Sequence, residues 1–253
     1  MQNKTKAEQA LQQLADQYVD FEVEGKKVPI PYILNSGRWR FWRTAGKGTP
    51  NGIRNELFRI VSKSNFEITT KSAFEIYDFM REHKIYIDCS GLAFHLLDCY
   101  VQTASETRLE EVLLRLPGKI GKIEKELLSY KRERRISAAV LTSDLNSVAV
   151  TDLQEIQIGD LIEINKEIDH VLVITDLTYQ NGTISQIEYV HSSSLHTRKR
   201  GPHYGAITIK DIAKGLEDQL WHEKMKDGSN YGEGMYHPER GDGVRRLIVI
   251  NDF

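Results

Sequence analysis

The spacing of apolar residues changes its period once along this chain, near residue 156. Before that point apolar side chains recur every three or four positions, as in residues 5–19 (TKAEQALQQLADQYV), which is typical of amphipathic helices. After it come short runs, LIEI, VLVIT and IEYV, that are separated by turn residues such as Asn181-Gly182. Helices first and an antiparallel sheet afterwards, without strand–helix–strand alternation, predict the α+β class.

The individual elements follow from the same pattern. Besides 5–19, helices are expected over 49–62, 72–83 and 89–103, and two charged helices over 105–116 and 119–135. Residues 21–43, with Trp39 and Phe41 between arginines, are expected to form a strand or an extended arm. Strands are expected over 159–164, 169–177, 185–193 and 206–210 and at the C-terminal end, with a helix or turn over 211–224.

Charge and hydropathy exclude several classes of function. The 34 lysines and arginines are balanced by 36 aspartates and glutamates, so there is no basic surplus for a phosphate backbone, and no nucleic-acid partner is expected. Apolar runs such as 171–174 are too short to span a membrane, and the first residues lack a continuous apolar signal segment. The default expectation is a cytoplasmic protein, with export by another route or a trimmed signal left open.

The chain has two cysteines, and both fall within the helix expected over 89–103. They would be separated by about 15 Å along its axis, too far for a disulfide between them. Cys99 lies among apolar neighbours and is expected to act as a small hydrophobic residue. Cys89 follows Asp88, a favoured N-cap residue, and therefore occupies the first helical turn. Unpaired amides and the helix dipole favour an anion there, so a lowered thiol pKa is expected.

Two histidines are expected to lie near each other. His170 begins the strand VLVIT and His191 ends IEYV, and a hairpin turning at Asn181-Gly182 brings these strand ends side by side. A base and a residue that orients it are what nucleophilic catalysis by cysteine requires. The other histidines lack this register and are expected to be surface or core residues: His83, His95, His196, His203, His222 and His237.

Three short motifs, in this order, resemble the NlpC/P60 cysteine peptidases of the papain-like superfamily. They are DCSG at 88–91, GD at 159–160 with His170 ten residues later, and VHSSS at 190–194. The resemblance implies Cys89 as nucleophile, His170 as general base and His191 as the residue that orients it. It also implies that Asp88 and Ser90 help to hold a substrate amine.

The resemblance also implies a fold and a division into domains. The Cys89 helix would pack on an antiparallel half-barrel in a catalytic domain over 66–253, which contains a helical insertion at about 104–150. Residues 1–65 would form an N-terminal extension.

The function predicted in this way is a cysteine-dependent amide hydrolase. Its substrate would be a peptidoglycan-type stem peptide or a related small peptide, cleaved through an acyl-enzyme on Cys89. An acyltransferase, a deamidase and an inactive binding module on the same scaffold remain as alternatives. The oligomeric state is left open.

No cofactor or metal is expected. The sequence lacks HExxH and C-x-x-C motifs, and Gly46-Lys47-Gly48-Thr49 lacks the spacing of a phosphate-binding loop. A zinc cluster of His191, His196 and His203 is a minor alternative.

Overall fold

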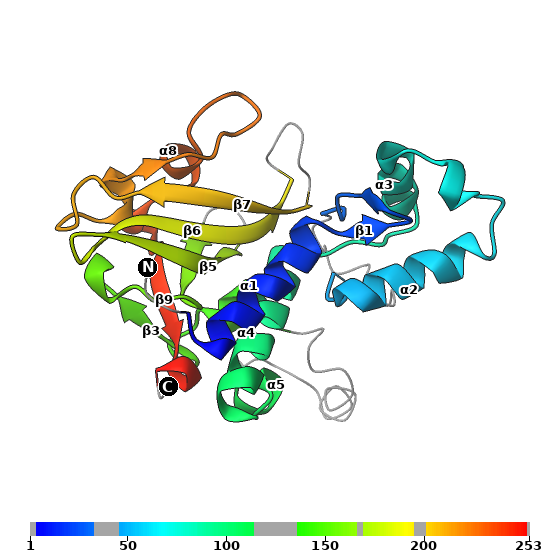
Figure 1. Ribbon diagram of the computed structural model, residues 1–253. Coiled ribbons are helices and arrows are strands. Elements are labelled where there is room, and N and C mark those ends of the chain that lie inside the picture. The colour runs from blue at the N-terminus through cyan, green and yellow to red at the C-terminus, as the bar shows by residue number, and fades with distance from the viewer. Residues whose placement is uncertain (1–3, 33–45, 114–135, 166–168, 195–200, 252–253) are drawn as a thin grey trace.

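The computed structural model describes residues 4–32, 46–113, 136–165, 169–194 and 201–251. It is an α+β protein with a seven-stranded antiparallel sheet in the order β3-β9-β4-β5-β6-β7-β8, as predicted for the class (Figure 1). The strands of this sheet are β3 (Ser147–Val150), β4 (Leu161–Asn165), β5 (Asp169–Gln180), β6 (Thr183–Ser193), β7 (Gly201–Thr208), β8 (Leu220–Trp221) and β9 (Gly243–Leu247). A separate hairpin pairs β1 (Glu22–Val23) with β2 (Lys26–Lys27).

The helices begin where the sequence supplies caps. They are α1 (Lys6–Val19), α2 (Pro50–Val61), α3 (Ala73–Glu82), α4 (Cys89–Ser105), α5 (Leu109–Val112), α7 (Ala138–Leu141) and α8 (Tyr231–Met235). Thr5 and Ser72 each form a capping box with a glutamate three residues later, and Thr49 caps a helix whose first residue is Pro50. The helices expected over 5–19, 49–62, 72–83 and 89–103 are thereby confirmed.

The hairpin of β5 and β6 forms the middle of the sheet. Its turn residues Asn181 and Gly182 both have positive φ (53° and 82°), as a tight hairpin turn requires. Each strand carries one extra residue, at the shifts between Ile174 and Asp176 and between Thr178 and Tyr179. Because the two shifts fall on opposite strands they cancel, and the register set at the turn is regained where Val173 pairs with Val190.

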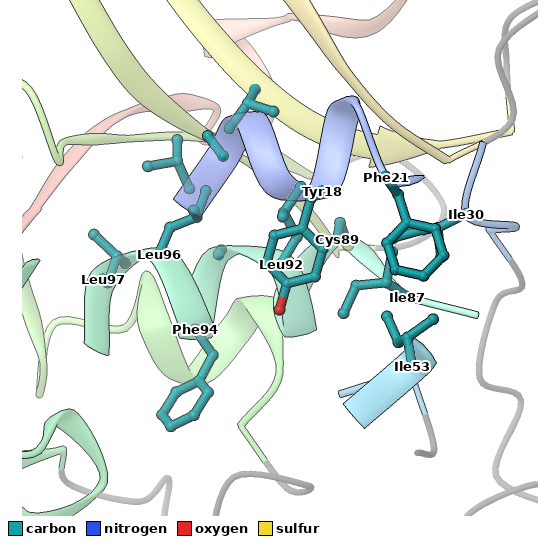
Figure 2. Packing of buried hydrophobic residues seen from close by; sticks show 14 of the residues in the cluster. Tyr18, Phe21, Ile30, Ile53, Ile87, Cys89, Leu92, Phe94, Leu96 and Leu97 are labelled. Atoms are coloured by element: carbon teal, nitrogen blue, oxygen red, sulfur yellow. The ribbon is translucent and has the colours of Figure 1, made fainter. Parts of the chain in front are cut away.

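Helices α1 and α4 pack together on one face of the sheet, and β1, α2 and α3 lie on the side of this pair away from the sheet (Figure 1). One apolar core joins these layers, and it includes Tyr18 and Phe21 from the N-terminal part together with Leu92 and Leu96 of α4 (Figure 2). A second core covers the other face of the sheet. The boundary drawn after residue 65 stays a prediction, and side chains from both sides of it share the first core.

Some elements differ from the expectation. Of the helix or turn expected over 211–224, the structure forms a short 3-10 turn (Leu216–Asp218), followed by the unexpected strand β8. Strand β3 was not anticipated either, and the last strand ends at Leu247 in a further 3-10 turn. The helix expected over 119–135 lies outside the described residues, as do Trp39 and Phe41. Among the described helices, none combines the length and apolar character needed to cross a bilayer.

Candidate active site

Cys89 is the first residue of α4 and lies at the junction of this helix with the sheet. Asp88 is the N-cap, and its carboxylate accepts a hydrogen bond of 2.6 Å from the Gly91 amide. Cys89 is buried, with 7% of the residue exposed, and is part of the apolar core (Figure 2). The backbone amides of Ser90 and Val171 are within hydrogen-bonding reach of its sulfur. The helix end expected from DCSG is therefore present, with the neighbouring strand β5 directly against it.

Glycine at position 91 permits a close approach of two chain segments. A Cβ at this position would lie 2.0 Å from the carbonyl oxygen of Gly46, far inside contact distance. That carbonyl accepts a hydrogen bond of 3.1 Å from the Asp88 amide. The fourth residue of DCSG is therefore required because no side chain fits between α4 and the segment that carries Lys47.

Lys47 is a buried partner of the helix end that sequence reasoning missed. Its ammonium lies 2.9 Å from the Asp88 carboxylate and also donates to the Ser90 hydroxyl. The Lys47 side chain is only 4% exposed, so this ion pair is part of the interior. Asp88 and Ser90 are thus placed beside Cys89, and both already bind an amine of the chain itself. Their role in substrate binding stays a prediction.

His170 and His191 are brought together as their register predicted. His170 Nε2 lies 2.8 Å from His191 Nδ1, a direct hydrogen bond between the rings. The Val171 amide that reaches the Cys89 sulfur belongs to the residue after His170, and the hydroxyl of Ser192, next to His191, donates to the Ile87 carbonyl at 2.9 Å. Both histidines are therefore held on strands that are tied to the start of α4.

Three further buried side chains, those of Glu223, His203 and Tyr189, lie on the far side of His191 from His170. His191 Nε2 is 2.9 Å from Glu223 Oε1, and His203 Nε2 is 3.2 Å from the same oxygen. The Tyr189 hydroxyl donates to Glu223 Oε2 at 2.5 Å. No motif marks Glu223, because only the pairing of β7 with β8, two residues before it, brings it here. His203 is buried, and it faces His191 across the β6–β7 pair.

The same cluster could hold a metal ion. His191, His203 and Glu223 each offer a ligand atom, and these atoms lie within 4.8 Å of one another. Two histidines and a glutamate form a known zinc ligand set. His196, named for a zinc cluster from the sequence, lies outside the described residues. The 2.9 Å separation of His191 Nε2 from Glu223 Oε1 is that of a direct hydrogen bond, which needs no ion. His203 Nδ1 donates to the Gly201 carbonyl at 2.7 Å and burial lowers the pKa of this ring to about 4, so its Nε2, 3.2 Å from Glu223, carries no proton at neutral pH.

Burial shifts the pKa values of both Cys89 and His170. Loss of solvent and the charge of Asp88 raise the pKa of Cys89 to about 12, although Lys47 and two amides act in the opposite direction. Burial and the neighbouring His191 hold the pKa of His170 well below its usual value. The expected lowering of the thiol pKa is therefore wrong for this state, because desolvation outweighs the helix N-terminus. At neutral pH the pair is a neutral thiol and a neutral imidazole.

This protonation state predicts how Cys89 reacts with iodoacetamide. Below the pKa the thiolate fraction rises about tenfold per pH unit, so the labelling rate should do the same between pH 6 and 9. The measurement is the rate of mass gain in a Cys99→Ala variant, with the Cys89→Ala/Cys99→Ala double variant as the blank. A rate that stays constant between pH 6 and 7 would instead indicate a preformed thiolate–imidazolium pair.

The described residues thus link two imidazoles, on strands β5 and β6, to each other and to a carboxylate by hydrogen bonds, and both strands pack against the helix that begins at Cys89. Covalent catalysis by a thiol requires a base that is oriented in this way by a hydrogen bond. Comparison with known proteins gives no further information about this site. No family model matches the sequence, and neither a search of curated proteins nor one of solved structures finds a significant match.

Proposed function

We propose that the protein is a cysteine-dependent amide hydrolase with a papain-like arrangement of its site. Cys89 is the nucleophile, His170 the general base and His191 the residue that orients it. The observation that carries the proposal is the 2.8 Å hydrogen bond between the imidazoles of His170 and His191. His170 lies on β5, and the backbone amide of the next residue, Val171, is within hydrogen-bonding reach of the Cys89 sulfur. A catalytic base needs such a fixed orientation beside its nucleophile.

The proton transfers follow from this bond. Since His170 Nε2 is bonded to His191, Nδ1 is the ring nitrogen that takes the thiol proton. The thiolate then attacks the carbonyl carbon of the amide, and His170 returns the proton to the departing amine, which leaves a thioester on Cys89. His170 then takes a proton from water, and the resulting hydroxide attacks the thioester. The C–S bond breaks, the product acid leaves, and His170 returns the proton to the Cys89 sulfur.

Developing charge on the carbonyl oxygen needs hydrogen-bond donors near the sulfur. The N-terminus of α4 supplies backbone amides. Burial and the charges of Cys89 and Asp88 raise the pKa of the Tyr32 hydroxyl and keep it protonated, so we propose it as the second donor. We assign the oxyanion site to this side of Cys89.

The proposed substrate is a small peptide, with peptidoglycan-type stem peptides as the first class to test. This class comes from the resemblance of DCSG, GD and VHSSS to the NlpC/P60 peptidases. Lys47 narrows the range of substrates, because its ammonium already binds Asp88 and Ser90, the two groups that would hold a substrate amine. A substrate whose own amine must bind these two groups has to displace Lys47.

The decisive experiment identifies both the bond and the acceptor. The protein is incubated with stem peptides in ¹⁸O water, with and without a second amine, and the products are analysed by mass spectrometry beside Cys89→Ala. A free acid that carries ¹⁸O and forms only with the thiol supports hydrolysis. Products that form equally with Cys89→Ala, or no labelled acid and no thioester from any peptide of the panel, would refute the proposal.

Acyl transfer is the second candidate, and the burial of Cys89 favours it. Because Cys89 is buried, its thiol lies in a site from which water is largely excluded, where an amine bound in place can compete with water for the thioester. A new amide in the presence of the second amine, with little free acid, would show transfer. Release of ammonia from a side-chain amide would show deamidation.

A further inference from the structure

We propose that Glu223 is a positioning residue that fixes the proton positions on both histidines, so that the site is a relay of four groups: Cys89, His170, His191 and Glu223. This inference rests on the proposed function and deepens it. It follows from the chain of contacts in which His170 Nε2 meets His191 Nδ1 and His191 Nε2 meets Glu223 Oε1.

Glu223 is held firmly enough to orient a neighbour. Its side chain is 4% exposed, and the Tyr189 hydroxyl donates to Oε2 while His191 lies against Oε1. Its backbone carbonyl accepts a hydrogen bond of 2.9 Å from the amide of Tyr231, in α8. The carboxylate is therefore fixed both by its own oxygens and by the chain that carries it.

The proton positions follow from what each atom can donate. An ionised carboxylate only accepts hydrogen bonds, so His191 must carry its proton on Nε2. Its Nδ1 is then bare and accepts from His170, whose proton must be on Nε2. His170 Nδ1 is left with a lone pair, the form that can remove a proton from Cys89. Each bond in the relay fixes the tautomer of the next ring.

The same charge also assists the transfer itself. When His170 takes the thiol proton it becomes a cation in a buried site, where burial opposes the charge. The negative charge of Glu223 acts against that penalty, through a His191 ring that is already polarised toward it. Glu223 thus favours the protonated state of His170 that forms during the reaction.

Glu223→Gln separates this role from a merely structural one, because the side chain keeps its shape. If the amide nitrogen faces His191, the tautomers of both rings are reversed, and if the amide oxygen faces it, the charge is lost. We expect kcat/KM to fall about 10²- to 10⁴-fold, by analogy with carboxylate-to-amide changes in Ser-His-Asp sites. Tyr189→Phe is the matched control, since it removes one bond to the same carboxylate but keeps the charge and the His191 contact, and we expect a loss within about tenfold.

Nitrogen NMR of ¹⁵N-labelled histidine rings tests the inference without any substrate. In the wild-type protein His170 and His191, assigned with single variants, should both carry the proton on Nε2, and Glu223→Gln should move protons to Nδ1 or weaken the bond between the rings. A Nδ1-protonated His191 in the wild type would overturn the inference, even if the peptidase assay succeeds. So would a folded Glu223→Gln variant with nearly full activity.

A metal ion on the cluster is the competing explanation, and the same spectra exclude or reveal it. Zinc on His191 Nε2 would place the proton on Nδ1, and its removal with a chelator would change the spectrum. Spectra that are unchanged by a chelator and by added zinc support the relay. If no peptide is cleaved but both rings are Nε2-protonated, the proposed function fails while the assignment of Glu223 stands.

Discussion

Replacing Cys89 by alanine should lower kcat/KM at least about 10⁴-fold, the largest effect of any single substitution in this chain. In the proposed mechanism the sulfur forms the acyl bond, and loss of the nucleophile of a comparable hydrolase leaves only the small rate enhancement that comes from binding and from oxyanion donors. Activity is measured on the peptide that mass spectrometry identifies as substrate. The variant should stay folded, since alanine fills most of the space of this small buried side chain.

Cys99→Ala is the control that the chain itself offers. Cys99 lies ten residues further along α4, is half-buried, and has a thiol pKa that burial raises. Because it has no place in the proposed relay, we expect its substitution to change kcat/KM less than about twofold. Equal losses in the two variants, or activity of Cys89→Ala above about a tenth of wild type, would contradict the assignment of the nucleophile.

The local elements of the site could be predicted from sequence because each has a local signal. Asp88 caps α4 as its position before an apolar periodic run indicated. Asn181-Gly182 indicated the hairpin, and the hairpin indicated that His170 and His191 lie close enough for their side chains to meet. The two register shifts could not be foreseen, but they fall on opposite strands and leave the predicted pairing intact.

The other partners could not be predicted, because they reach the site through the folded chain. Lys47 lies 41 positions before Asp88, and Glu223 lies 32 positions after His191, each in a segment without a recognisable motif. The predicted direction of the shift in the Cys89 pKa was wrong for a related reason. The N-terminal position of Cys89 can be read from sequence, whereas its burial depends on how α1, α4 and the sheet pack together.

The Lys47–Asp88 pair gives the largest expected effect on stability. Removing one partner of a buried ion pair leaves the other charge without compensation, which costs about 3–5 kcal/mol. Lys47→Met leaves the Asp88 carboxylate with the Ser90 hydroxyl and the Gly91 amide, and Asp88→Asn leaves the Lys47 ammonium beside a neutral amide. Both should lower the free energy of unfolding in urea, and the double variant should be less unstable than the sum of the two losses.

The two substitutions should change the reactivity of Cys89 in opposite directions, although both destabilise the fold. The Lys47 charge lowers the pKa of the thiol and the Asp88 charge raises it. Iodoacetamide at pH 8 should therefore label Cys89 roughly three- to tenfold more slowly in Lys47→Met and faster by a similar factor in Asp88→Asn. General loosening of the fold would accelerate labelling in both variants. Acceleration in both would thus show that the pair only holds the helix end in place, whereas opposite changes show that its charges also set the ionisation of the thiol.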